Sequence, residues 1–196
     1  MMTKHKEDPV LGDKDQEIIA VGASVASGCL PCIKFHLRAA AGAGASEGDI
    51  RQAAGDAARV RMAATGIMAR AGGLTQAEWS PAIPEPDGAP TMLRELVAIA
   101  AAYAVNCCTS VRGHMDAARA LGATDGQMFA ALKIACAIRD VACQKAKAEA
   151  GAVLGASEEQ AVSCCGSEDE EAVDGEAGGC SCQPGDLDDS KKSDQI

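Results

Sequence analysis

The chain has 196 residues, of which 47% are hydrophobic and 2% aromatic, and alanine and glycine are abundant. Alanine is the strongest helix former, whereas strands need β-branched and aromatic side chains, so we expect an all-α fold and exclude an all-β sandwich or barrel. No run of about 18 uncharged apolar residues occurs, and residues 1–13 lack the basic and then apolar order of a secretory signal. We therefore expect no membrane anchor, no secretory signal and a cytoplasmic location.

The negative charge of the chain is concentrated at its C-terminal end. Asp and Glu number 28 and Lys and Arg 18, for a net charge of −10. Twelve of the acidic residues and two of the lysines lie in residues 158–196, so residues 1–157 carry 16 charges of each sign. A neutral body with an acidic tail has no positive surface for nucleic acid or for an anionic membrane, and we exclude both as partners.

The chain holds ten cysteines. Without a secretory signal, this many thiols indicate redox chemistry or metal binding rather than a secreted disulfide scaffold. Their placement in pairs is more informative than their number: Cys29 and Cys32, Cys107 and Cys108, Cys136 and Cys143, Cys164 and Cys165, Cys180 and Cys182.

An internal repeat organises most of the sequence. When the chain is shifted by 78 residues it aligns with itself without a gap, and residues of unlike type coincide: Glu17 with Glu95, Cys29 with Cys107, His36 with His114, 44–48 with 122–126, Ile50 with Met128 and Arg61 with Arg139. Two copies of one structural unit therefore follow each other.

Each copy is predicted to contain three helices. Gly28 suits the position after a helix end, Pro31 a first helical turn, and Ser46 and Thr124 are good N-caps. The predicted helices are Gln16–Ser27, a helix beginning near Cys29 and running to Ala43, Asp49–Arg70, Leu93–Val105, Val111–Leu121 and a long helix from Thr124 to about Ala150.

Composition divides the chain further. Glycine and four prolines indicate an extended connector between the copies, and the Gly, Ser and acidic residues of the tail predict disorder. The predicted segments are an N-terminal extension (1–14), the first repeat (15–71), a Pro-rich connector (72–92), the second repeat (93–157) and an acidic, cysteine-containing tail (158–196).

The first copy carries the pattern Glu17, eleven residues, Cys29-Leu-Pro-Cys32 and, four residues later, His36. On a helix Cys32 and His36 lie one turn apart, so both thiols and the imidazole are predicted on one face. A CxxC at a helix N-terminus favours the thiolate, which is the reactive nucleophile. His36 can transfer protons and Glu17 can orient it, so the pattern predicts a redox dithiol with a proton relay.

This pattern on an alanine-rich helical chain resembles the AhpD-like branch of the carboxymuconolactone decarboxylase family, across about residues 15–150. The resemblance implies an all-α homo-oligomer, a trimer or hexamer, that reduces hydroperoxides and disulfides without a tightly bound cofactor. It also implies that Cys32 attacks the peroxide, Cys29 resolves the product, and His36 with Glu17 relays protons. A lipoyl-bearing protein as reductant and a peroxiredoxin as electron acceptor are the partners implied.

The second copy departs from the pattern. It keeps Glu95, Cys107 and His114 but has Ser110 where the first copy has Cys32, so it cannot form the same disulfide. We expect this copy to be structural rather than catalytic.

Three alternatives remain open. Cys29, Cys32 and His36 could ligate zinc, with Glu17 or water as the fourth ligand. The tail thiols, Cys164, Cys165, Cys180 and Cys182, could capture a soft metal or a metalloid such as arsenic, or could shuttle electrons to the dithiol. The chain could also be a lyase of the carboxymuconolactone decarboxylase type, for which a redox dithiol would be superfluous. Cys136 and Cys143 are expected to pack in the core, as free cysteines commonly do.

Overall fold

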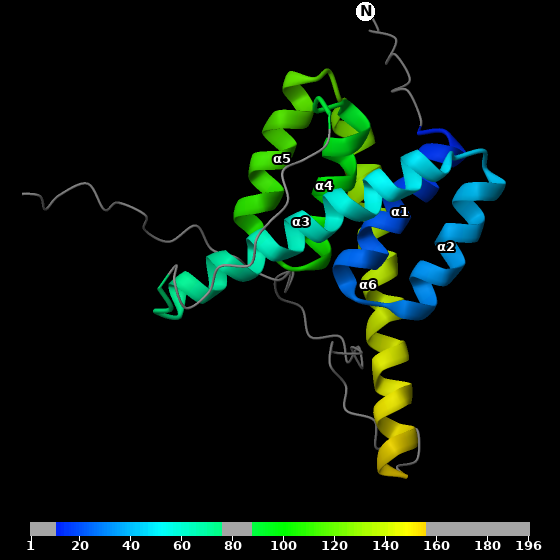
Figure 1. The fold of residues 1–196 in the computed structure, drawn as a ribbon, viewed down its shortest axis with the longest axis vertical. Coiled ribbons are helices and arrows are strands. Elements are labelled where there is room, and N and C mark those ends of the chain that lie inside the picture. Colours follow the sequence, from blue (N-terminus) through cyan, green and yellow to red (C-terminus); the bar gives the residue numbers. More distant parts are fainter. Residues whose placement is uncertain (1–10, 76–87, 156–196) are drawn as a thin grey trace, which may run out of the picture. The chain divides into compact units, whose positions relative to one another are not determined.

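A computed structural model describes residues 11–75 and 88–155, and no strand occurs among them. The chain divides into two units, Met1–Val162 and Ser163–Ile196, and the helices of the described residues belong to the first (Figure 1). They are α1 (Asp13–Ser27), α2 (Leu30–Gly42), α3 (Glu47–Ala71), α4 (Met92–Ala104), α5 (Cys108–Ala120) and α6 (Asp125–Leu154). The prediction of an all-α protein is confirmed.

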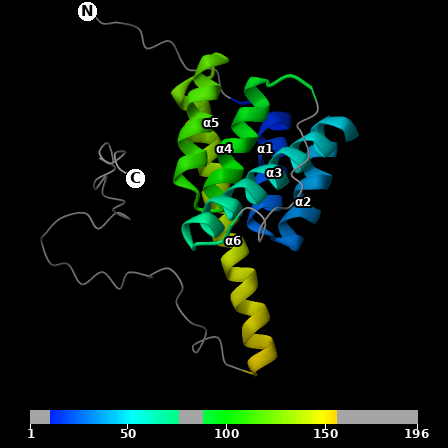
Figure 2. The same ribbon diagram turned by 60° about the vertical axis from the view of Figure 1, so that its left-hand side comes forward.

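The helix contacts follow the internal repeat. Helices α1 to α3 belong to the first copy and α4 to α6 to the second, and α1 packs along α4 at the centre (Figures 1 and 2). Helix α3 contacts both α1 and α4, and α6 likewise contacts both α4 and α1. The third helix of each copy therefore packs against the first helix of the other copy, so each copy needs the other to complete its core.

The core lies where α1 and α4 meet. The largest fully buried side chains include Ile19 from α1, Leu96 and Ile99 from α4, and Met128 from α6. At the crossing, a Cβ atom on Gly22 would lie 2.6 Å from the Val97 Cγ1 atom. Glycine at this position therefore lets the backbone of α1 approach α4 more closely than any larger residue would allow.

The predicted helix caps are confirmed. Ser46 and Asp49 form a capping box at the start of α3, and Thr124 and Gln127 form another at the start of α6. Gly28 ends α1 with a φ of 73°, a left-handed conformation that favours glycine.

Four helices begin earlier than predicted, α3 and α4 by one or two residues and α1 and α5 by three. Helix α1 begins at Asp13 instead of Gln16, because Gly12 already has extended N-cap geometry and two acids, Asp13 and Asp15, occupy the first turn. Helix α5 begins at Cys108 instead of Val111, because Cys107 has the extended backbone of an N-cap residue. Of the other predicted segments, most of the N-terminal extension, the centre of the connector (76–87) and the tail (158–196) lie outside the described residues.

The prediction that Cys136 and Cys143 pack in the core is wrong. Cys136 is exposed and Cys143 is half-buried. The buried residues of α6 are Gln127, Met128, Ala131, Ala135 and Ile138. Cys136 lies off this stripe, and Cys143 lies beyond its last member, in the C-terminal half of the helix. The C-terminal end of α6 extends past the other helices (Figures 1 and 2). No helix in the described part of the chain has both the length and the hydropathy needed to cross a membrane.

Candidate active site

The two cysteines of the first repeat lie at the N-terminus of α2. Cys29 is the N-cap residue, with an extended backbone, and the backbone N–H of Cys32 donates to its Sγ atom at 3.3 Å. The two residues form a disulfide with Cα atoms 5.3 Å apart, and each is 6% exposed. The positive end of the helix dipole and the donated hydrogen bond both favour negative charge on the Cys29 sulfur when the disulfide is opened.

His36 and Glu17 form a pair that joins α2 to α1. The His36 Nδ1 atom lies 2.8 Å from the Glu17 Oε2 atom, and both side chains are partly buried. An ionised carboxylate only accepts hydrogen bonds, so Nδ1 carries the proton and donates a hydrogen bond to Glu17. The Nε2 atom of the neutral ring is then an acceptor that can receive a proton from a reacting group.

A cavity of about 460 Å³ brings the cysteine, the histidine and the glutamate together. Cys32 lines this cavity and its disulfide partner does not. The remaining wall is mostly apolar and comes largely from α6 of the other repeat, through Ile134, Ala137, Ile138 and Val141, with Lys145 as its one basic residue. Of the two cysteines, Cys32 is therefore the one that an organic molecule in the cavity can contact.

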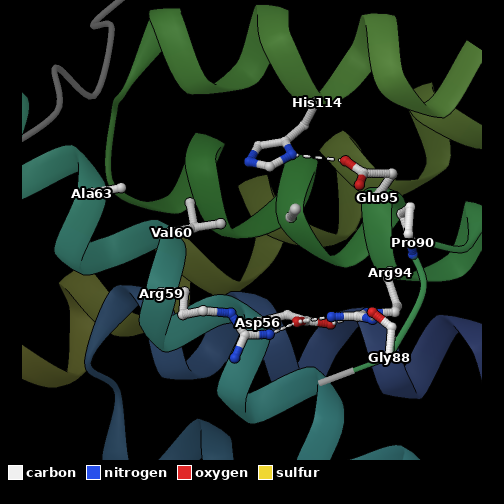
Figure 3. A pocket seen from close by; sticks show the side chains of 10 residues that line it. Asp56, Arg59, Val60, Ala63, Gly88, Pro90, Arg94, Glu95 and His114 are labelled. Carbon is white, nitrogen blue, oxygen red and sulfur yellow. Dashed lines mark hydrogen bonds and ion pairs between the residues drawn. The ribbon is translucent and has the colours of Figure 1, made fainter. Parts of the chain in front are cut away.

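The second repeat keeps the same local geometry without the disulfide. The Cys107 Sγ atom lies 3.1 Å from the Ser110 Oγ atom, and the His114 Nδ1 atom lies 2.8 Å from the Glu95 Oε2 atom. A second cavity, of about 380 Å³, is lined by His114 and Glu95 with residues of α3 (Figure 3). Sequence reasoning had assigned this copy a structural role and had not predicted that it keeps a cavity.

Arg61 and Arg139 are also related by the repeat, and each contacts the C-terminal part of the first helix of its own copy. The Arg61 Nη1 atom donates to the Ala26 carbonyl at the C-terminal end of α1, at 3.0 Å. The Arg139 guanidinium lies over the ring of Tyr103 near the end of α4, 5.1 Å from its centre. Hydrogen bonding to Cys136 and then partial burial raise the pKa of Tyr103, so the exposed Cys136 thiol interacts with this aromatic residue.

The structure brings together the four residues predicted for the site. Cys29 and Cys32 are joined, and Cys32, His36 and Glu17 face one cavity. The apolar wall from α6 was missed, because residues more than a hundred positions away along the chain carry no local signal of their proximity to the motif. Within residues 11–75 and 88–155, no group of three or more His, Cys, Asp or Glu side chains is arranged to hold a metal ion. The tail cysteines lie outside the described residues.

The fold and the site define a helical protein of two repeats with a dithiol at the N-terminus of a helix in the first repeat. The model of the carboxymuconolactone decarboxylase family matches residues 1–77 and again residues 68–152. The chain therefore belongs to the carboxymuconolactone decarboxylase family and contains two copies of its domain. Searches of curated proteins and of solved structures found no match.

Proposed function

We propose that the protein is a thiol oxidoreductase of the AhpD type, which reduces organic hydroperoxides or disulfides through the Cys29–Cys32 dithiol. One observation carries the proposal: Cys32, bonded to Cys29, faces the same cavity as the His36–Glu17 pair. A nucleophilic thiol, a proton-transfer group and a residue that orients it are the parts that thiol chemistry requires.

In the reduced protein, the Cys32 thiolate attacks the distal oxygen of a hydroperoxide and the O–O bond breaks. His36 delivers a proton to the departing alkoxide, which leaves as an alcohol, and Cys32 becomes a sulfenic acid. Cys29 then attacks the Cys32 sulfur, water leaves, and the disulfide forms. A disulfide substrate follows the same course, with a thiol as the leaving group and a mixed disulfide as the intermediate.

An external dithiol must restore the reduced state. Its thiolate attacks the sulfur of Cys32, which is the cysteine that lines the cavity. Cys29 leaves as a thiolate, which is stabilised by the N–H of Cys32 and by the helix terminus. The second thiol of the reductant then displaces Cys32, so the reductant leaves as a disulfide and both cysteines are reduced.

The proposal includes the biological setting. A supply of dithiol implies a reducing compartment, so we place the protein in the cytoplasm, with a lipoyl-bearing protein as reductant, a peroxiredoxin as electron acceptor and a homo-oligomer, a trimer or hexamer, as the working form. The exposed apolar residues near the dithiol, Leu30 and Phe35, are consistent with a surface that a partner covers.

The deciding experiment measures the reduction potential of the Cys29–Cys32 pair by alkylation and mass spectrometry in graded thiol buffers, together with the metal content of the protein. We expect a reversible disulfide with a potential between about −180 and −270 mV, the range of dithiol oxidoreductases. A pair that stays reduced because it holds stoichiometric zinc would overturn the redox function and support metal binding.

The paired glutamates give a second test. Glu17→Gln removes the charge that orients His36, and we expect kcat for hydroperoxide reduction to fall about 10- to 100-fold, with a changed pH profile of kcat. Glu95→Gln makes the same change in the second repeat, where no dithiol is present, and we expect kcat to stay within about twofold. Equal losses in steady-state assays of the two variants would show that the His–Glu pairs stabilise the fold rather than act in proton transfer.

A further inference from the structure

The two cavities are related by the internal repeat. Residues 78 positions apart take corresponding places in their walls, and several of these pairs are identical or similar. They are Glu17 and Glu95, Ala20 and Ala98, His36 and His114, Ile138 and Val60, and Val141 and Ala63. The second cavity is therefore a second version of the site, built from α3, α4 and α5 instead of α6, α1 and α2.

The two versions differ in charge on one wall. Where the first cavity has Ile134 and Ala137, the second has Asp56 and Arg59. Arg94, which replaces Gln16, donates to both carboxylate oxygens of Asp56 at 2.9 Å. Arg59 donates to the same carboxylate. One carboxylate therefore balances two guanidinium groups, and this wall keeps an excess of positive charge.

Arg59 is the group that is available to a ligand. Its side chain is 17% exposed and lines the cavity, and among the described residues its hydrogen-bond partner is Asp56 alone. A guanidinium carries five N–H donors in a planar fork that matches a carboxylate. Most of these donors are therefore free to bind an anion in a partly buried place, where a charge-assisted hydrogen bond is strong.

The rest of the cavity offers an acceptor and an apolar surface. His114 donates its Nδ1 proton to Glu95, and its other ring nitrogen points away from Glu95 into the cavity (Figure 3). Val60, Ala63 and Ala98 provide the apolar surface. Among the described residues no cysteine lines this cavity, so the proposed ligand does not depend on the dithiol.

We propose that the second cavity binds a small organic monocarboxylate, with its carboxylate on the Arg59 guanidinium and its apolar body against Val60, Ala63 and Ala98. A hydroxyl group at the far end of the ligand would donate to the His114 Nε2 atom. The volume of about 380 Å³ admits a molecule of the size of a substituted benzoate. This site is distinct from the dithiol site and goes beyond the proposed redox function.

The test uses the full-length protein, whose three histidines give few imidazole signals in a ¹H–¹⁵N spectrum. Benzoate is titrated against benzamide, which has the same shape and no charge, and against 4-hydroxybenzoate. We expect benzoate to shift the His114 signals, 4-hydroxybenzoate to bind more tightly, and benzamide to leave the signals unchanged. Arg59→Met should raise the Kd for benzoate at least about 10-fold, and Arg59→Lys should raise it less.

The matched control is Ala137→Ser, at the related position of the first cavity, which should leave the Kd for benzoate unchanged. Three results would overturn the proposal: benzamide shifts His114 as strongly as benzoate does, benzoate shifts the His36 signals instead, or the Kd is the same in wild type, Arg59→Lys and Arg59→Met. Cys32→Ser should bind benzoate normally, so this result is independent of whether the dithiol proves to be redox-active.

Discussion

Replacement of Cys32 by serine should lower the turnover of hydroperoxides and disulfides by about a thousand-fold or more, the scale seen when a catalytic nucleophile is removed. Cys32 is the half of the dithiol that faces the cavity, so a hydroxyl at this place leaves no thiolate for the substrate to meet. The measurement is the consumption of cumene hydroperoxide, and of a small disulfide, with a dithiol as reductant.

Two further cysteine variants sharpen this test. Cys107→Ser removes the corresponding thiol of the second repeat and should leave turnover within about twofold. Cys29→Ser should still reduce one equivalent of peroxide and then stop, with the Cys32 sulfenic acid trapped by dimedone. If Cys32→Ser keeps full turnover, thiol catalysis is wrong. If it loses no activity in a lactone decarboxylation assay, the lyase activity of the family becomes the better explanation.

Replacement of Asp56 by alanine should lower the free energy of unfolding by about 3 kcal/mol or more, because it leaves charges without their partner in a mostly buried place. The Asp56 side chain is 9% exposed, and those of Arg94 and Arg59 are 15% and 17% exposed. Arg94 also donates hydrogen bonds to the Gly88 and Ala89 carbonyls, so the loss of stability extends to the end of the connector. Urea unfolding followed by circular dichroism measures the change.

The repeat supplies the control for Asp56. The triple variant Asp56→Ile, Arg59→Ala and Arg94→Gln installs the residues that the first cavity has at the same places: Ile134, Ala137 and Gln16. Replacing a buried ionic cluster by well-packed uncharged residues is close to neutral. Arg94→Gln also removes the hydrogen bonds to the Gly88 and Ala89 carbonyls, so we expect the triple variant to be destabilised less than Asp56→Ala. If Asp56→Ala is as stable as wild type, the charges are solvated and the cluster does not stabilise the fold.

The sequence by itself determined the helical class, the repeat and the positions of the caps. Alanine content excluded a β fold, a shift of 78 residues aligned the two copies, and Ser46 and Thr124 marked the starts of α3 and α6. These features are local, because a helix cap or a helix propensity depends on neighbours within a few residues. Helix starts with less specific caps, such as that of α1 at Gly12, were placed a few residues late.

The residues of the dithiol motif could also be identified from their spacing in the sequence alone. Cys29, Cys32 and His36 lie within two helical turns, and Glu17 was found because Glu95 repeats its distance to the next cysteine. The contact between the Glu17 and His36 side chains, at 2.8 Å, agrees with that reasoning. Their roles in proton transfer stay predictions.

Only the tertiary structure decided what surrounds these residues. Each third helix packs against the first helix of the other copy, so α6 closes the dithiol cavity and α3 closes its counterpart. The same packing left Cys136 exposed, and it placed Asp56 and Arg59 where the first cavity has an apolar wall. Such contacts join residues far apart in the chain, and their pairing depends on the shape of the whole helical core rather than on any local pattern.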